Sequence, residues 1–262
     1  MIKLNSLRSD KIWGYEDWIA STHPNGMQKE FRDFAGGDYP LLVKIIQAED
    51  DLSVQVHPND EFASRHENCR GKTECWYVLS ARKNAQLVYG LDDQYSPEEI
   101  KKAVKDESIE DMLFYADVRP GDFIYIPAGT VHAIGGGLRL LEVQQSSDIT
   151  YRLYDWGRGR ECHVEKGVSC IDESQISDIG PFDKSFECPY FSLEEIISEG
   201  KYGEQVKAAE ASGPSSVVLY FVLEGEGKIN GMAASREDIF AFKNGEKMDS
   251  DGKLRLLKII PA

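Results

Sequence analysis

The apolar residues of this chain occur in short runs separated by turn-forming residues, and this pattern predicts a mainly β protein. Some runs alternate between apolar and polar positions, as strands with one covered face do, and others are continuously apolar. Their valine, isoleucine and aromatic residues favour strands over helices. In the first half of the chain the predicted strands cover residues 40–46, 52–57, 73–79, 121–126 and 138–145.

The second half of the chain has the same texture, with strand-like runs at residues 191–197, 216–223 and 254–260. The glycine-containing stretches at residues 225–227 and 230–231 are predicted to be hairpin turns. Such short strands separated by turns indicate a second small β-barrel or sandwich. We therefore predict two β domains, at residues 1–165 and 166–262.

One stretch has the signature of a helix. Ser96 is placed to cap its start, Pro97 suits the first turn, and Glu99 completes a capping box. The helical spacing of apolar residues continues to about Ala116. Residues 96–116 are therefore predicted to be a helical insertion between strands.

Composition and charge narrow the classes of partner. The 262 residues are 41% hydrophobic, which is ordinary for a globular protein, and can bury a sizeable core. The net charge of −15 argues against a nucleic acid or an anionic membrane as partner. An anionic substrate would require the basic side chains, or a metal, to be gathered at one place.

The cellular location is predicted from what the sequence lacks. We see neither the early apolar run of a signal peptide nor a membrane-spanning apolar segment. The five cysteines form no C-x-x-C pair and are expected to be reduced thiols in a cytoplasmic protein. The oligomeric state is left open, and a monomer is compatible with the sequence.

Two side chains of the strand at residues 52–57 are candidate metal ligands. Gln55 and His57 share one face of this strand and lie about 6.6 Å apart, so both side chains can bend towards one ion. Pro58 then ends the strand, and Asn59 or Asp60 can cap a following helix. Taken alone, the pair is weak evidence, because a single strand histidine is more often structural.

Glu74 and His132 occur in comparable settings. Glu74 shares a strand face with Trp76, and a carboxylate facing an apolar interior must be paired, protonated or bound to a metal. His132 ends the pattern G-x5-P-x-G-x2-H of residues 121–132, in which Pro127 ends a strand and Gly129 permits a tight turn.

The pattern at residues 121–132 resembles the second metal motif of the cupin superfamily. The first half as a whole is similar to type I mannose-6-phosphate isomerases, whereas the second half resembles the short bacterial members only in length and β texture. The resemblance implies two jelly-roll domains of the cupin type, of which only the first binds metal. The matching segments, in the family's order, are residues 40–44, 52–59, 71–74, 127–132 and 142–152.

In that family a single zinc ion is held by a glutamine, two histidines and a glutamate. The resemblance places these ligands at Gln55, His57, His132 and Glu74, with one Zn²⁺ per chain. Imidazole and carboxylate ligands suit this ion, and an incomplete shell leaves room for substrate or water. The activity implied is the interconversion of mannose 6-phosphate and fructose 6-phosphate, in which a proton moves between C1 and C2 through an enediol.

The resemblance also implies catalytic side chains. Arg152 matches the family's active-site arginine, Asp148 could orient it, and Lys72 stands where the family has an active-site lysine. Glu142 is an additional candidate for proton transfer. Longer members of the family carry a histidine just before the lysine, where this chain has Gly71. A proton-relay role at that position is therefore in doubt.

Structural interpretations compete with these roles. Asp148 and Arg152 could form a plain ion pair, and Lys72 could be a surface lysine. Lys44, between Val43 and Ile45, could point into a cavity or extend to the surface.

Two other functions stay open at this point. One is a different metal-dependent cupin enzyme, such as an oxygenase that uses iron, and the other is a non-catalytic protein that binds a sugar phosphate. An oxygenase has no obvious use for Lys72 and Arg152. The complete ligand set argues against a protein that has lost its chemistry.

Overall fold

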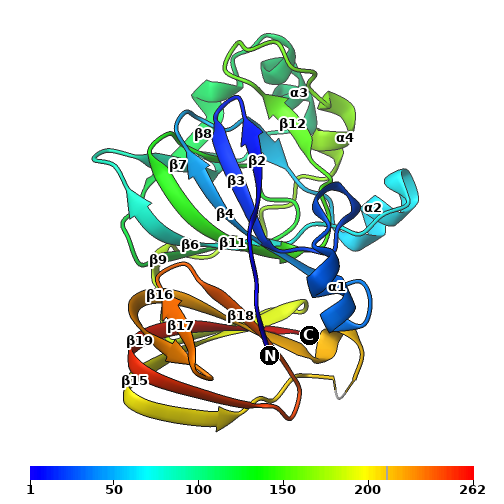
Figure 1. The fold of residues 1–262 in the computed structure, drawn as a ribbon. Coiled ribbons are helices and arrows are strands. Elements are labelled where there is room, and N and C mark those ends of the chain that lie inside the picture. Colours follow the sequence, from blue (N-terminus) through cyan, green and yellow to red (C-terminus); the bar gives the residue numbers. More distant parts are fainter. Residues whose placement is uncertain (211) are drawn as a thin grey trace. The chain divides into compact units, whose positions relative to one another are not determined.

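The computed structural model describes residues 1–210 and 212–262 and is built mainly of strands, which confirms the predicted fold class (Figure 1). By their contacts the residues form two compact units, each assembled from segments far apart in sequence. The central unit comprises Arg8–Asp17 and Val43–Pro181. The terminal unit comprises Met1–Leu7, Trp18–Leu42 and Phe182–Ala262.

Two sheets make up most of the central unit. The five-stranded sheet has the order β12 (Tyr151–Tyr154), β5 (Val54–Val56), β10 (His132–Ile134), β7 (Gln86–Leu91) and β8 (Leu113–Asp117). The seven-stranded sheet has the order β13 (Gly180–Pro181), β9 (Asp122–Ile126), β6 (Glu74–Ala81), β11 (Leu138–Gln145), β4 (Leu41–Ala48), β3 (Gly14–Ala20) and β2 (Leu7–Lys11).

A buried apolar cluster joins the inner faces of these two sheets. It contains Trp76 and Ile124 from the seven-stranded sheet and Leu87 and Ile134 from the five-stranded sheet. A second cluster lies on the opposite face of the five-stranded sheet, where side chains such as Val88 pack with residues of α3 and α4. The five-stranded sheet is therefore covered on both faces, as in a jelly roll with an added helical layer.

The helices are short, and the predicted caps are confirmed. In the central unit, Asn59 caps α2 (Asp60–Glu67), Ser96 and Glu99 form the capping box of α3 (Pro97–Lys105), and α4 spans Val164–Ser169. The terminal unit has α1 (Lys29–Ala35) and two short 3₁₀ helices, η1 (Pro24–Gly26) and η3 (Pro214–Ser216). Among the described residues, none of the helices has both the length and the apolar character needed to cross a membrane.

The predicted helical insertion at residues 96–116 is wrong in its second part. The helix ends at Lys105, Asp106 is its C-cap, and Glu107 adopts a left-handed backbone conformation with φ of 58°. One 3₁₀ turn follows, η2 (Ile109–Met112), and the chain then enters β8. Pairing between β8 and β7 overrides the local helical pattern, because strand pairing depends on partners distant in sequence.

The terminal unit contains one seven-stranded sheet. Its order is β1 (Ile2–Lys3), β18 (Ile239–Lys243), β16 (Val217–Ile229), β19 (Lys247–Pro261), β15 (Phe191–Gln205) and β14 (Ser185–Glu187), and β17 (Met232–Ser235) also pairs with β16. The pairing of β1 with β18 brings the first residues of the chain to this sheet. The division into domains at residues 1–165 and 166–262 follows chain order and stays a prediction.

One of the two predicted hairpin turns is confirmed and the other is wrong. Asn230 and Gly231 connect β16 to β17, as predicted. Residues 225–227 instead lie within β16, next to a bulge in its pairing with β19. A Cβ atom on Gly225 would overlap the carbonyl oxygen of Lys253, so this glycine allows close approach of a neighbouring strand.

Candidate metal centre and active site

Cross-strand pairing gathers three of the predicted site residues in one row. Gln55 pairs with His132 on one side and with Arg152 on the other, so β10, β5 and β12 place the three side chains on the same face. Directly paired side chains lie about 5 Å apart at Cβ. His57 follows two residues after Gln55, so its side chain lies on the same face as this row.

Glu74 approaches from the seven-stranded sheet and meets both histidines. Its Oε2 lies 3.7 Å from His57 Nε2, and its Oε1 lies 3.6 Å from His132 Nε2. All three side chains are buried. The sequence therefore predicted correctly that His57, Glu74 and His132 lie together, and their candidate ligand atoms are all within 4.8 Å of one another.

The orientation and the protonation state of the two imidazole rings suit metal ligands. His132 Nδ1 donates to the Thr130 carbonyl at 2.9 Å, which leaves a lone pair on Nε2. His57 Nε2 accepts a hydrogen bond from Lys72 Nζ at 2.9 Å. Burial lowers the pKa of His132 to about 4, and burial together with Lys72 also lowers the pKa of His57. Both rings are neutral at neutral pH.

The donor set fits a divalent cation. Lone pairs on imidazole nitrogen and carboxylate oxygen repel one another unless a cation or a proton lies between them. The Lys72 ammonium contacts both His57 Nε2 and Glu74 Oε2 and relieves this repulsion for one of the two pairs. Glu74 Oε1 and His132 Nε2 have no hydrogen-bond partner among the described residues. Two ligand atoms about 2.1 Å from one tetrahedral ion lie about 3.4 Å apart, close to the two spacings found here.

Lys72 completes this cluster and is not a surface lysine. Its ammonium lies 2.7 Å from Glu74 Oε2, and the residue is buried. Burial and the nearby charge of Glu142 raise the pKa of Glu74 to about 7, despite the opposing effect of Lys72. Further positive charge beside Glu74 would therefore stabilise its ionised form.

A second buried charge cluster adjoins the site. Lys44 Nζ lies 2.9 Å from Glu142 Oε1 and 3.3 Å from Glu16 Oε1, and Trp76 Nε1 donates to Glu142 Oε2 at 2.9 Å. Burial alone would raise the pKa of Glu142, but Lys44 and Lys72 outweigh it and hold the pKa below its usual value.

The sequence left the orientation of Lys44 open, and the structure places it inside. In its strand β4 all residues except Gln47 are buried, and since successive side chains point to opposite faces, both faces of the strand are covered. The apolar residues on both sides of Lys44 were the available signal.

Arg152 and Asp148 lie farther out than the metal ligands. Arg152 is partly exposed, and its Nη1 donates to the Glu161 carbonyl at 2.7 Å. Asp148 is exposed in the segment between β11 and β12. Asp148 does not share a strand face with Glu142, because β11 ends at Gln145.

Gly71 is packed where no side chain fits. A Cβ atom at this position would lie 2.5 Å from Asp60 N and 2.7 Å from Pro58 O. The next residue is fixed to the same segment, because Lys72 N donates to Pro58 O at 3.0 Å. A histidine at position 71, as in longer members of the family, would require the backbone on one side to move.

Replacing Gly71 by alanine is therefore expected to destabilise the protein by about 1–3 kcal/mol, because the added methyl group meets backbone atoms. It should also weaken metal retention, since Lys72 and His57 flank the displaced segment. Urea unfolding and metal analysis would measure the two effects. Gly180→Ala is the matched control, with open space around its Cβ and an expected change within about 0.5 kcal/mol. Equal stability of the two variants would contradict the prediction.

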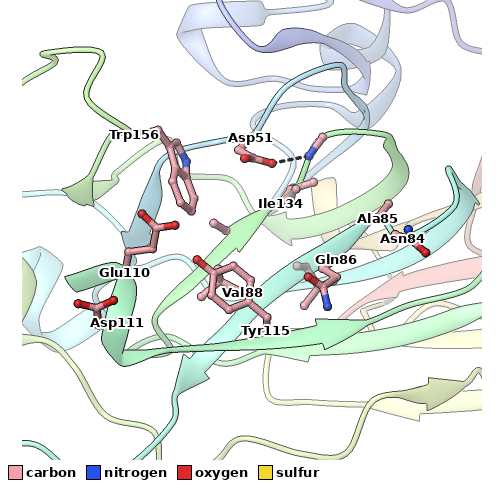
Figure 2. Close-up of a pocket in the computed structure, with 14 residues that line it drawn as sticks. Asp51, Asn84, Ala85, Gln86, Val88, Glu110, Asp111, Tyr115, Ile134 and Trp156 are labelled. Carbon is pink, nitrogen blue, oxygen red and sulfur yellow. Dashed lines mark hydrogen bonds between the residues drawn. The ribbon is translucent and has the colours of Figure 1, made fainter. Parts of the chain in front are cut away.

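A separate hollow of about 490 Å³ opens by the five-stranded sheet (Figure 2). Trp156 and Tyr115 contribute aromatic walls, and Asp51, Glu110 and Asp111 contribute carboxylates. Burial and these acids raise the pKa of Tyr115 to about 12. None of the 14 lining residues, all of them described, is lysine or arginine, so this hollow disfavours an anionic ligand.

Fold and site together define a metal-binding enzyme of the cupin type. A family model described as phosphomannose isomerase type I, catalytic domain, matches residues 2–97. Mannose-6-phosphate isomerase ManA of Bacillus subtilis is 39% identical over 236 residues, which cover 83% of this chain and 71% of ManA. The chain therefore belongs to the mannose-6-phosphate isomerase family, and it is an isomerase.

Solved structures agree with this membership. The mannose 6-phosphate isomerase structure from Bacillus subtilis superimposes with a TM-score of 0.82 and 27% identity, covering 98% of each chain. A mannose 6-phosphate isomerase bound with zinc and yttrium shares the fold at a TM-score of 0.68 and 15% identity, covering 99% of this chain and 98% of the other.

Proposed function

We propose that this protein is a zinc-dependent isomerase that interconverts mannose 6-phosphate and fructose 6-phosphate through an enediol. The observation that carries the proposal is the convergence of His57, Glu74 and His132 on one buried point, beside Lys72. Gln55, paired with His132, supplies the fourth ligand. A cytoplasmic location and one Zn²⁺ per chain belong to the same proposal.

The charges of the buried cluster suit this chemistry. Three carboxylates, Glu16, Glu74 and Glu142, face three ammonium groups, Lys11, Lys44 and Lys72, so the ionised cluster has no net charge. A divalent cation would change this sum to +2, which favours an anionic sugar whose oxygen gains negative charge during the reaction. When bound, the ion would polarise the C1 and C2 oxygens as a Lewis acid.

The chain's own residues supply the groups for proton transfer, for hydrogen bonding to the oxyanion and for substrate binding. Glu142 is held ionised by Lys44 and fixed by Trp76, so it can accept a proton at neutral pH and return it. Lys72 can donate a hydrogen bond to a developing oxyanion at the metal end of the substrate. Arg152, in the same row as Gln55, can bind the anionic substrate, and Asp148 can orient Arg152.

Removal of the metal tests the proposal. Treatment with a chelator is expected to abolish the formation of fructose 6-phosphate from mannose 6-phosphate in a coupled assay, and added Zn²⁺ should restore it. Metal analysis before and after treatment shows whether the ion was removed. Full activity in metal-free protein would refute zinc dependence. Binding of the sugar without any product would identify a non-catalytic binding protein instead.

A further inference from the structure

The loop after β12 carries two arginines anchored to one buried carboxylate. Arg160 binds Asp155 in a bidentate manner, with Nε 2.9 Å from Oδ2 and Nη2 2.5 Å from Oδ1. Arg158 Nη2 lies 3.1 Å from Asp155 Oδ1, and its Nε donates to the Asp155 carbonyl at 3.0 Å. The Asp155 side chain is only 4% exposed, whereas those of Arg158 and Arg160 are 21% and 33% exposed.

These two arginines lie close to Arg152, because Arg152 Nη1 donates at 2.7 Å to the carbonyl of Glu161, the residue that directly follows Arg160. Burial lowers the pKa of Arg152, and the charges of Arg160 and Arg158 also lower it, although Asp155 acts in the opposite direction. Arg152 Nε is buried and has no hydrogen-bond partner among the described residues. Exposed Glu161 contacts Arg152 through its backbone carbonyl. Two of the three guanidinium groups thus share one buried carboxylate, and the third lies beside them, in a chain of net charge −15.

The three arginines lie at the accessible end of the row of paired side chains that runs from His132 through Gln55 to Arg152. His132 is fully buried, whereas Gln55 and Arg152 are partly exposed. β12 is the edge strand of its sheet, and the loop continues outward from it. Two strand spacings, about 9.6 Å in total, separate β10 from β12. That distance is comparable with the length of a hexose 6-phosphate whose C1 end is at the metal.

The two lysines beside the candidate metal site are less accessible than these arginines. Lys72 and Lys44 are buried, whereas the side chains of Arg158 and Arg160 are 21% and 33% exposed. The hollow beside Trp156 is lined by carboxylates and repels a phosphate (Figure 2).

We propose that Arg152, Arg158 and Arg160 together bind the phosphate group of the sugar, and that Asp155 holds the latter two arginines in position. Guanidinium groups suit this role because their planar donors match the oxygens of a phosphate. Asp155 is a positioning residue, which reduces the side-chain entropy lost when the substrate binds. This inference rests on the proposed function and specifies which end of the substrate faces which part of the site.

The test is a double variant, Arg158→Gln with Arg160→Gln. We expect KM for mannose 6-phosphate to rise roughly 10- to 100-fold, because charged hydrogen bonds are lost, and kcat to change less than about threefold. Inhibition by inorganic phosphate should weaken by a similar factor, and calorimetric titration with inorganic phosphate should show the same loss. Asp155→Asn should raise KM less, since both arginines remain.

Matched controls separate binding from folding. Arg82→Gln removes an exposed arginine that pairs with Glu49 in the same unit and should leave KM unchanged. Metal content and melting temperature show whether each variant is folded. If the double variant does not fold, the single variant Arg158→Gln decides, with the same expected direction. An unchanged KM in a folded variant, or a loss confined to kcat, overturns the inference.

The results also distinguish this inference from the proposed function. If the wild-type protein isomerises mannose 6-phosphate but the variant keeps its KM, the phosphate site is wrong and the function stands. If the wild-type protein shows no isomerase activity but binds inorganic phosphate through these arginines, the function is wrong and the phosphate site stands.

Discussion

Replacing His132 by alanine is expected to remove the bound metal and to reduce isomerase activity more than about 100-fold, the upper end of what the loss of a supporting residue costs. The side chain is fully buried, its Nδ1 is fixed by Thr130, and its Nε2 faces Glu74. No other histidine belongs to the ligand cluster found among the described residues except His57. Metal analysis of the purified variant, followed by the coupled assay, measures both effects.

The control for this variant is His66→Ala. His66 is exposed on α2, and its ring lies 4.2 Å from that of Phe62. Its loss should leave metal content unchanged and turnover within about twofold. A His132→Ala protein with unaltered metal content and turnover would disprove the assignment of His132 as a ligand.

Replacing Lys44 by methionine is expected to have the largest effect on stability, about 3–5 kcal/mol at neutral pH. The variant keeps a similar side-chain volume but leaves the buried carboxylates of Glu142 and Glu16 without their shared ammonium. Urea unfolding at fixed metal concentration would give the free energy of unfolding. Lys11→Met is the control, because Lys11 pairs with the same Glu16 from a position 34% exposed and should contribute less than about 1 kcal/mol.

The stability contributed by the pairing of Lys44 with Glu142 is expected to depend on pH. Glu142 has a lowered pKa in the folded state, so its pairing stabilises the protein above about pH 4.3 and the stabilisation is lost as pH falls through the folded pKa. Glu142 and Glu16 raise the pKa of Lys44 against the effect of burial, so its contribution is lost only as pH rises above about 10.4.

The stability difference between wild type and Lys44→Met should shrink as pH falls from 7 towards 4, because without Lys44 the burial of Glu142 raises its pKa in the variant, and its carboxylate is neutralised at a higher pH than in the wild type. Adding Glu142→Gln to Lys44→Met should recover part of the loss at neutral pH, because one unpaired charge is removed. A difference that stays constant over this range would show that packing, and not charge, accounts for the effect.

Local sequence signals predicted the parts of this protein that depend on neighbours in the chain. Asn59 and Ser96 cap helices as expected, and Gly231 lies in a hairpin turn. The metal-site residues could also be found from the sequence, because each lies on or beside a short β-strand in a chemically unusual position. The family resemblance supplied the link among them, since no local pattern specifies which strands become neighbours.

The two wrong predictions have a common physical cause. The strand at Leu113–Asp117 and the glycines at residues 225–227 depend on partners distant in sequence. The orientation of Lys44, which the sequence left open, depends on such partners too. The loop arginines were missed for a similar reason: Arg158 and Arg160 look like solvated charges until the buried carboxylate of Asp155 is seen between them.

The strand order of the terminal unit also constrains how the chain folds. β19, at Lys247–Pro261, lies between β16 and β15, and β1 joins the same sheet through β18. This sheet therefore cannot close until residue 261 has left the ribosome, whereas residues 8–181, which contain the whole metal site, are synthesised earlier. Contacts across such long sequence separations form slowly, so the incomplete sheet would expose strand edges during synthesis. We therefore expect chaperones to bind the strands of the terminal unit more than those of the central unit during synthesis.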